Sequence, residues 1–91
     1  PADPAELPEA ENELDFLTKI KAVFRLDIIR HTNLLNKKIK KVALCGGSGS
    51  SLVHAAIAAE ADIFISGDFK YHEFFDAENR IIIADIGYYE R

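Results

Sequence analysis

The chain has 91 residues, of which 48% are hydrophobic and 29% are charged, a balance typical of one small globular domain. Its net charge of −4 argues against nucleic acid as a partner, and no apolar run approaches the roughly 20 residues of a membrane helix. The single cysteine, Cys45, can form no disulfide within the chain, which favours a reducing, cytoplasmic location.

The first twelve residues differ in composition from the rest of the chain. They contain all three prolines and several acidic residues but no basic side chain. Residues 1–12 are therefore predicted to form a linker or arm that does not pack, and residues 13–91 are predicted to form the domain. The chain also contains no methionine and begins at Pro1, so we expect it to be a piece of a larger protein.

An amphipathic helix is predicted over residues 13–24. Its apolar residues recur at near-helical spacing, and its acidic residues precede its basic ones, an order that suits the helix dipole. Residues 25–32 alternate well enough to predict a strand, and residues 33–40 are predicted to form a turn.

The second half of the chain predicts alternating strands and helices. Residues 40–45, 62–66 and 81–86 are short apolar runs typical of buried strands, and residues 51–61 are rich in alanine and predict a helix. Between the last two strands, residues 67–80 predict a loop with a helical turn. This order predicts an α/β fold with a small, mostly parallel or mixed sheet flanked by helices.

The segment "CGGSGSS", residues 45–51, lies between a predicted strand and a predicted helix. Backbone N–H groups at such a corner can bind phosphate or carboxylate, and the serines can cap the helix. A dinucleotide-binding loop would have a third glycine where Leu52 stands, so a tight turn with a capped helix remains an alternative. The candidate anion-binding residues here are Gly46, Gly47, Ser48, Gly49 and Ser50.

The segment "SGDFKYHE", residues 66–73, is the densest group of chemically active side chains. It follows a predicted strand, at the edge where parallel sheets commonly present their sites. Asp68 and His72 are the candidate catalytic residues, and Lys70 is a further candidate for binding an anion. An exposed polar loop explains the same residues equally simply, so that alternative stays open.

The motifs "CGGSGS", "GDFKYHEFFDAE" and the final "ADIG" occur in an order that resembles the carboxyl-terminal part of the Nif-three-like family. Members of this family are also described as GTP cyclohydrolase I type 2 homologues or dinuclear metal-binding proteins. The resemblance covers the chain from about residue 13 to residue 91. It implies that the chain is one half of a two-lobed fold, with the missing amino-terminal half and further copies of the protein as its partners.

The resemblance also implies two divalent metals, zinc or iron, held between the two halves in the full-length protein. In the family pattern, a histidine and a glutamate after the last strand are metal ligands. The present sequence matches at Gly87, but the histidine position is Tyr88 and the glutamate position lies beyond Arg91. No metal or other cofactor is therefore expected in this chain alone.

Three functions are compatible with these observations. The first is a structural piece of a Nif-three-like protein, incomplete as a metal site, that lines a cavity and contributes oligomer contacts. The second is a metal-dependent hydrolase of a nucleotide or phosphate compound in the full-length protein, with Asp68 and His72 beside the metals. The third is a non-catalytic nucleotide- or phosphate-binding module that uses the glycine corner.

Overall fold

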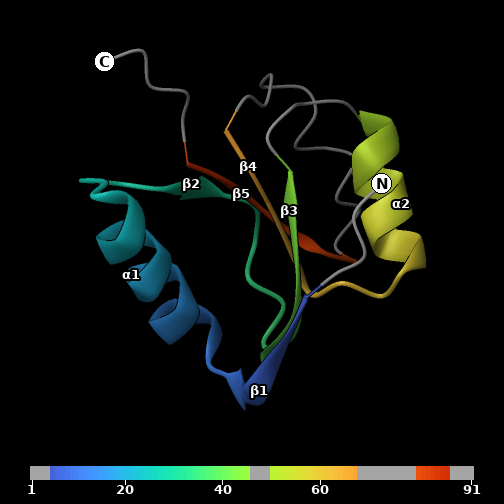
Figure 1. Cartoon of the computed structure of the whole chain (residues 1–91), viewed down its shortest axis with the longest axis horizontal. Coiled ribbons are helices and arrows are strands. Elements are labelled where there is room, and N and C mark those ends of the chain that lie inside the picture. The colour runs from blue at the N-terminus through green and yellow to red at the C-terminus, as the bar shows by residue number, and fades with distance from the viewer. Residues whose placement is uncertain (1–4, 46–49, 68–79, 87–91) are drawn as a thin grey trace.

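The computed structural model describes residues 5–45, 50–67 and 80–86, with residue 45 and residues 50–52 described in their backbone only. The described residues form seven elements (Figure 1), and none of the described helices is long and apolar enough to span a membrane. In chain order they are β1 (Ala5–Glu11), α1 (Glu13–Phe24), β2 (Arg30–His31), β3 (Ile39–Cys45), α2 (Ser50–Ala58), β4 (Ile63–Ser66) and β5 (Ile82–Asp85).

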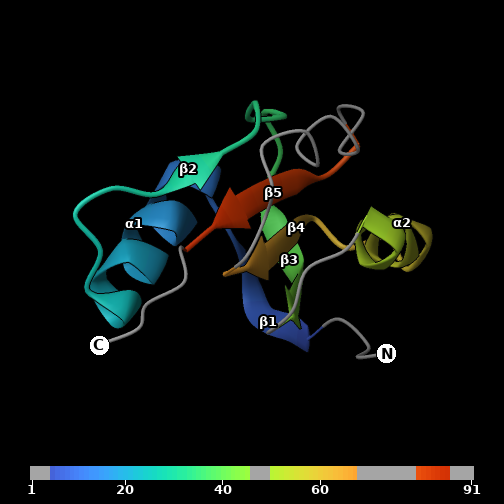
Figure 2. The ribbon, with the colours of Figure 1, turned by 90° about the horizontal axis from the view of Figure 1, so that it is seen from above.

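The five strands form one mixed sheet in the order β1-β3-β4-β5-β2. The three central strands β3, β4 and β5 are parallel, whereas β1 and β2 run antiparallel at the two edges. The predicted α/β fold with a mostly parallel or mixed sheet is therefore confirmed. Helices α1 and α2 lie on opposite sides of this sheet (Figure 2).

The prediction of an unpacked arm over residues 1–12 is wrong for Ala5–Glu11, which form strand β1. This strand pairs with β3, and Lys40 Nζ donates a hydrogen bond to the Pro8 carbonyl at 3.0 Å. The register of β1 against β3 shifts between Glu6 and Glu11. Pro8, which has no N–H group to donate, lies in this irregular part of the strand. Because edge strands tolerate proline and acidic residues, the presence of these residues in the first twelve positions does not exclude a strand.

The predicted helix over residues 13–24 is confirmed as α1. Asn12 caps its start, because the Asn12 Oδ1 accepts hydrogen bonds from the N–H groups of Leu14 at 2.8 Å and Asp15 at 3.2 Å. Arg25 ends it in the left-handed conformation, with a φ of 58°. The chain then becomes irregular, so the strand predicted over residues 25–32 is reduced to Arg30–His31.

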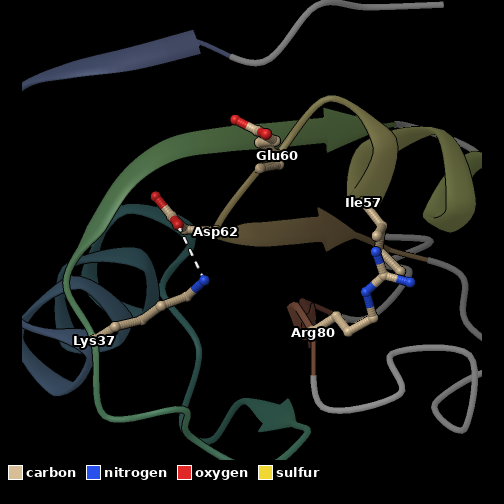
Figure 3. Close-up of a pocket in the computed structure, with 6 residues that line it drawn as sticks. Lys37, Ile57, Glu60, Asp62 and Arg80 are labelled. Atoms are coloured by element: carbon tan, nitrogen blue, oxygen red, sulfur yellow. Dashed lines mark ion pairs between the residues drawn. The ribbon is translucent and has the colours of Figure 1, made fainter.

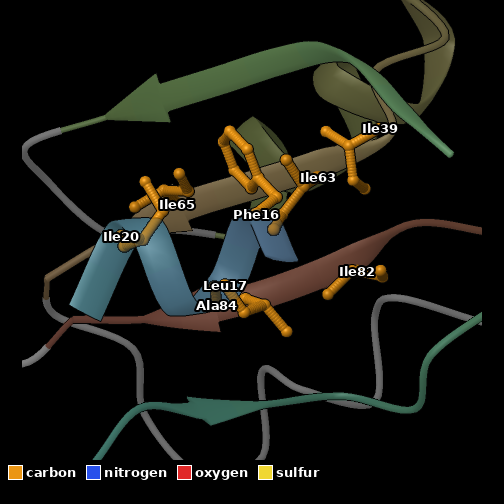
Figure 4. Packing of buried hydrophobic residues seen from close by; sticks show 8 residues of the cluster. All are labelled: Phe16, Leu17, Ile20, Ile39, Ile63, Ile65, Ile82 and Ala84. Carbon is orange, nitrogen blue, oxygen red and sulfur yellow. The ribbon is translucent and has the colours of Figure 1, made fainter. Parts of the chain in front are cut away.

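Two apolar clusters form the core, because alternate residues of a strand point to opposite faces of the sheet. The α1 face (Figure 4) comprises Phe16, Leu17, Ile20, Ile39, Ile63, Ile65, Ile82 and Ala84. The α2 face comprises Ala43, Val53, Ala56, Ala61, Phe64, Ile81 and Ile83. The central strands are thus buried on both faces, as continuous apolar runs predict.

A buried carboxylate fixes the loop that enters β3. Glu13, in the first turn of α1, accepts hydrogen bonds from the N–H groups of Leu35 at 2.8 Å and Asn36 at 3.2 Å. Asn36 has a φ of 61°, the left-handed conformation that asparagine tolerates better than most residues. The helix and the loop are therefore held together by one side chain.

Candidate functional site

The three parallel strands end in a single row across the sheet. Cys45 of β3 pairs with Ser66 of β4, and Ser66 pairs with Asp85 of β5. The chain therefore leaves all three strands at the same edge, which is the edge where open α/β sheets usually bind ligands. We call this the carboxyl edge of the sheet.

Two polar residues of this row, Ser66 and Asp85, are buried. Strand alternation places both on the α2 face, because their neighbours Phe64 and Ile83 belong to the α2-face cluster. The Ile86 N–H donates to the Ser66 carbonyl at 3.0 Å, which continues the ladder past the end of β5. The row is thus a rigid polar end to the apolar strands.

Arg30 forms an ion pair with the buried carboxylate of Asp85 from the neighbouring strand β2. The two residues are direct partners in the β2–β5 register, and the Arg30 side chain is 58% exposed. Thr32 secures β2, since its N–H donates to the Ile83 carbonyl at 3.0 Å and its Oγ1 accepts from the Ile83 N–H at 2.9 Å. An acid held by a guanidinium in this way is fixed in position at the carboxyl edge.

Most residues predicted as site residues lie outside the described part of the chain, and Ser50 is the exception. Ser50 is the first residue of α2, one residue before the predicted start of the helix, and its side chain is not described. The sequence reasoning missed the Arg30–Asp85 pair, whose only local signal is an acid at the end of an apolar strand. The predicted residues outside the described ranges are Gly46, Gly47, Ser48, Gly49, Asp68, Lys70, His72 and Tyr88.

Among residues 5–45, 50–67 and 80–86, no three histidine, cysteine, aspartate or glutamate side chains are grouped in a way that could hold a metal ion. The two carboxylates that are buried among the described residues, Glu13 and Asp85, already have protein partners. Glu13 accepts from backbone N–H groups, and Asp85 pairs with Arg30. These residues do not fit the two divalent metals that the family resemblance implies.

A pocket of about 370 Å³ lies at the opposite end of the strands, the amino edge (Figure 3). Among its described lining residues, two basic and two acidic side chains are balanced in number. The described residues that line it are Lys37, Ile57, Glu60, Ala61, Asp62 and Arg80.

Asp62 joins the three central strands at this amino edge. Its Oδ2 accepts from the N–H groups of Lys40 at 2.8 Å and Lys41 at 2.9 Å, and Lys37 Nζ lies 3.5 Å from its Oδ1. Its own N–H donates to the Lys41 carbonyl at 2.8 Å, and its carbonyl accepts from the Ile82 N–H at 3.2 Å. At the amino edge, Asp62 therefore links β3, β4 and β5 through hydrogen bonds.

Comparison with known proteins supports the resemblance seen in the sequence. A family profile described as Duf34/NIF3 (NGG1p interacting factor 3) matches residues 4–91. A Staphylococcus aureus protein named "GTP cyclohydrolase 1 type 2 homolog" is 33% identical over 87 residues, which cover 91% of this chain and 24% of the relative. A protein of the same name from Campylobacter jejuni is 40% identical over 72 residues, covering 78% of this chain and 29% of the relative.

Solved structures share this fold. A crystal structure of a Staphylococcus aureus protein matches with a TM-score of 0.79 and 33% identity over 92% of this chain and 24% of that chain. A Bacillus cereus protein related to NIF3 matches with a TM-score of 0.81 and 29% identity over 92% of this chain and 23% of that chain. This chain thus spans about a quarter of the length of these relatives. It belongs to the Duf34/NIF3 family.

Proposed function

We propose that this chain is a module of a longer Duf34/NIF3 protein in which its carboxyl edge forms one wall of a cavity. The module is incomplete as a metal site by itself. The remaining wall and the remaining metal ligands come from the part of the protein that this chain does not contain. The proposal combines the family membership with the chemistry of the carboxyl edge.

One observation carries the proposal: β3, β4 and β5 end in the paired row Cys45, Ser66 and Asp85. Every candidate site residue predicted after a strand, from Gly46 to Tyr88, follows one member of this row along the chain. The row is stiffened by the Arg30–Asp85 pair and by the buried Ser66. A wall built on rigid strand ends suits a site whose loops must meet another part of the protein.

The charges of the described carboxyl edge also suit a supporting wall. The Asp85 carboxylate is neutralised by Arg30, and no group of three metal-ligating side chains occurs in the described ranges. Because metal ligands must converge with suitable geometry, the residues of the described ranges would not hold a metal without ligands from other residues. The proposed incompleteness of the isolated chain rests on the family pattern, in which Tyr88 stands at the histidine position and the glutamate position lies beyond Arg91.

Metal analysis tests the proposal directly. The 91-residue chain is loaded with zinc(II) or iron(II), dialysed, and its bound metal measured by mass spectrometry beside the longer polypeptide treated in the same way. We expect far less than one metal per chain for the 91 residues and close to two for the longer polypeptide. Tight stoichiometric binding by the 91-residue chain would contradict the proposal.

The name of the curated relatives favours a second function for the longer protein, the hydrolysis of a nucleotide. In that function, Asp68 and His72 would act beside a metal centre, and Lys70 or the glycine corner would hold the phosphates. A screen of nucleoside mono-, di- and triphosphates with the metal-loaded longer protein tests this function. Asp68→Asn and His72→Ala are expected to lower turnover, whereas a longer protein that hydrolyses none of the compounds would exclude it.

A further inference from the structure

The buried stripe of helix α1 continues beyond the core that covers it. Phe16 lies beside Ile63 and Ile20 lies beside Ile65 (Figure 4), so α1 advances toward the carboxyl edge. Phe24 is one turn further along the same stripe, yet it is 40% exposed, and its neighbour Val23 is 66% exposed. The last turn of the helix thus presents apolar side chains that the described fold leaves exposed.

The sheet shows a matching exposure. Leu44, Ile65 and Ala84 pair across β3, β4 and β5, and strand alternation places all three on the α1 face. Ile65 and Ala84 are buried, but Leu44 is 57% exposed. Because Leu44 lies one strand away from Ile65 and Phe24 lies one turn away from Ile20, both border the same end of the core. We call Val23, Phe24 and Leu44 the apolar carboxyl-edge surface.

The described fold connects to the rest of the chain at the same edge. Strand β1 is antiparallel to β3, and its first residue, Ala5, pairs with Val42, so β1 begins toward the carboxyl edge. Strand β5 ends at Asp85, in the terminal row of that edge. Polypeptide that precedes or follows the described fold is therefore tethered beside the apolar carboxyl-edge surface.

We infer that the apolar carboxyl-edge surface is the docking site for the part of the longer Duf34/NIF3 polypeptide that lies outside these 91 residues. The inference rests on the proposed function and deepens it by assigning the contact to Val23, Phe24 and Leu44. The Staphylococcus aureus relative is about four times as long as this chain, since the 87 matched residues cover 24% of it. Tethering at this edge gives that additional chain a high effective concentration at the surface.

The apolar carboxyl-edge surface carries no charge, as expected of a surface that packs against another part of the same polypeptide. Its three members carry no ionisable group, and burying such side chains is the main favourable term in packing one part of a protein on another. Leu14 offers an internal comparison, because it is 59% exposed but lies in the first turn of α1, at the amino edge. It should remain exposed if docking is confined to the carboxyl edge.

Hydroxyl-radical footprinting with mass spectrometry tests the inference on unmodified proteins. Oxidation of Phe24 and Leu44 is compared between the 91-residue chain and the longer polypeptide, with Leu14 as the reference. We expect oxidation of Phe24 and Leu44 to fall several-fold in the longer polypeptide, with no change at Leu14. Equal oxidation of Phe24 and Leu44 in the two proteins would overturn the inference.

Metal content measured on the same samples separates the two proposals. A longer polypeptide that binds metal while Phe24 and Leu44 stay fully oxidised defeats the docking inference and leaves the proposed function standing. If Phe24 and Leu44 are protected from oxidation in a longer polypeptide that binds no metal, the docking inference is supported and the metal part of the proposed function is contradicted. If the 91-residue chain forms a dimer by sedimentation in which these residues are already protected, the occupant is a second copy and the inference is wrong.

A matched pair of variants adds a functional readout. Val23→Gln and Leu14→Gln both replace an exposed apolar residue on α1 with a good helix former, so neither should disturb the fold. With the 91 residues and the rest of the polypeptide supplied as two chains, Val23→Gln is expected to weaken association about tenfold and Leu14→Gln to leave it unchanged. Equal affinities for the two variants would overturn the inference.

Discussion

At the amino edge of the sheet, the Asp62 carboxylate accepts hydrogen bonds from backbone N–H groups and pairs with a lysine. At the carboxyl edge, exposed apolar side chains lie on the α1 face, and Asp85, which ends β5, pairs with the exposed Arg30. Asp62 joins β3, β4 and β5 with groups that belong to the described fold. The carboxyl edge leaves Val23, Phe24 and Leu44 uncovered by that fold. The difference indicates that the amino edge stabilises the domain, whereas the carboxyl edge is available for function.

Asp62→Ala is expected to have the largest effect on the stability of the 91-residue chain. It removes the acceptor of two backbone N–H groups, so we expect a loss of about 3 kcal/mol in the free energy of unfolding, measured by urea denaturation. Asp27→Ala is the control, because Asp27 is exposed and should change stability by less than about 0.5 kcal/mol. Equal effects of the two variants would remove the structural role assigned to the amino edge.

Asp85→Ala tests the carboxyl edge and is expected to destabilise the chain less, by about 2 kcal/mol, because Arg30 can be solvated once its partner is lost. Arg30→Gln should lower the free energy of unfolding by about 1 kcal/mol. The double variant should lower it by less than the sum of the two single losses. Additive losses in this double-mutant cycle would show that the ion pair does not couple the two residues.

Asn12→Ala measures the cap of α1 and should lower the free energy of unfolding by about 1 kcal/mol. Asn12→Asp keeps an acceptor oxygen for the Leu14 and Asp15 N–H groups. Its free energy of unfolding should therefore be close to that of the unchanged protein. Circular dichroism during thermal unfolding gives the comparison. Equal transition temperatures for the alanine and aspartate variants would contradict a capping role.

Val23→Gln should have the smallest effect on the 91-residue chain, within about 0.5 kcal/mol of the unchanged protein, because the side chain is exposed and glutamine is the better helix former. The same denaturation experiment measures it. A loss comparable with that of Asp62→Ala would mean that Val23 belongs to the domain core, and the contrast between the two edges would then fail.

Much of the fold could be predicted because its signals are local. Helix α1 combines a periodic apolar stripe with a favourable order of charges, and the three central strands are continuous apolar runs. Strand β1 could not be predicted, because its Pro8 and its acidic residues are acceptable only at the edge of a sheet. Its structure is decided by pairing with β3, which lies far away in the sequence.

The candidate site could be predicted only in part. Sequence motifs placed Asp68, His72 and Tyr88 after the strands, and the structure locates the strand ends from which these segments continue. The Arg30–Asp85 pair joins residues 55 positions apart through the β2–β5 register, and no local pattern encodes that register. Long-range pairing therefore limits what motifs alone can identify.

The two edge strands have a consequence for how molecules of this family can associate. Strand β1 carries Pro8 and three glutamates, and β2 is only two residues long. Proline lacks a backbone donor, and like charges repel when two such strands approach, so neither side of the sheet is a good template for adding a strand from another molecule. Sideways growth of the sheet, the route to fibrous aggregation, is thereby disfavoured, and association is directed to its ends and helical faces.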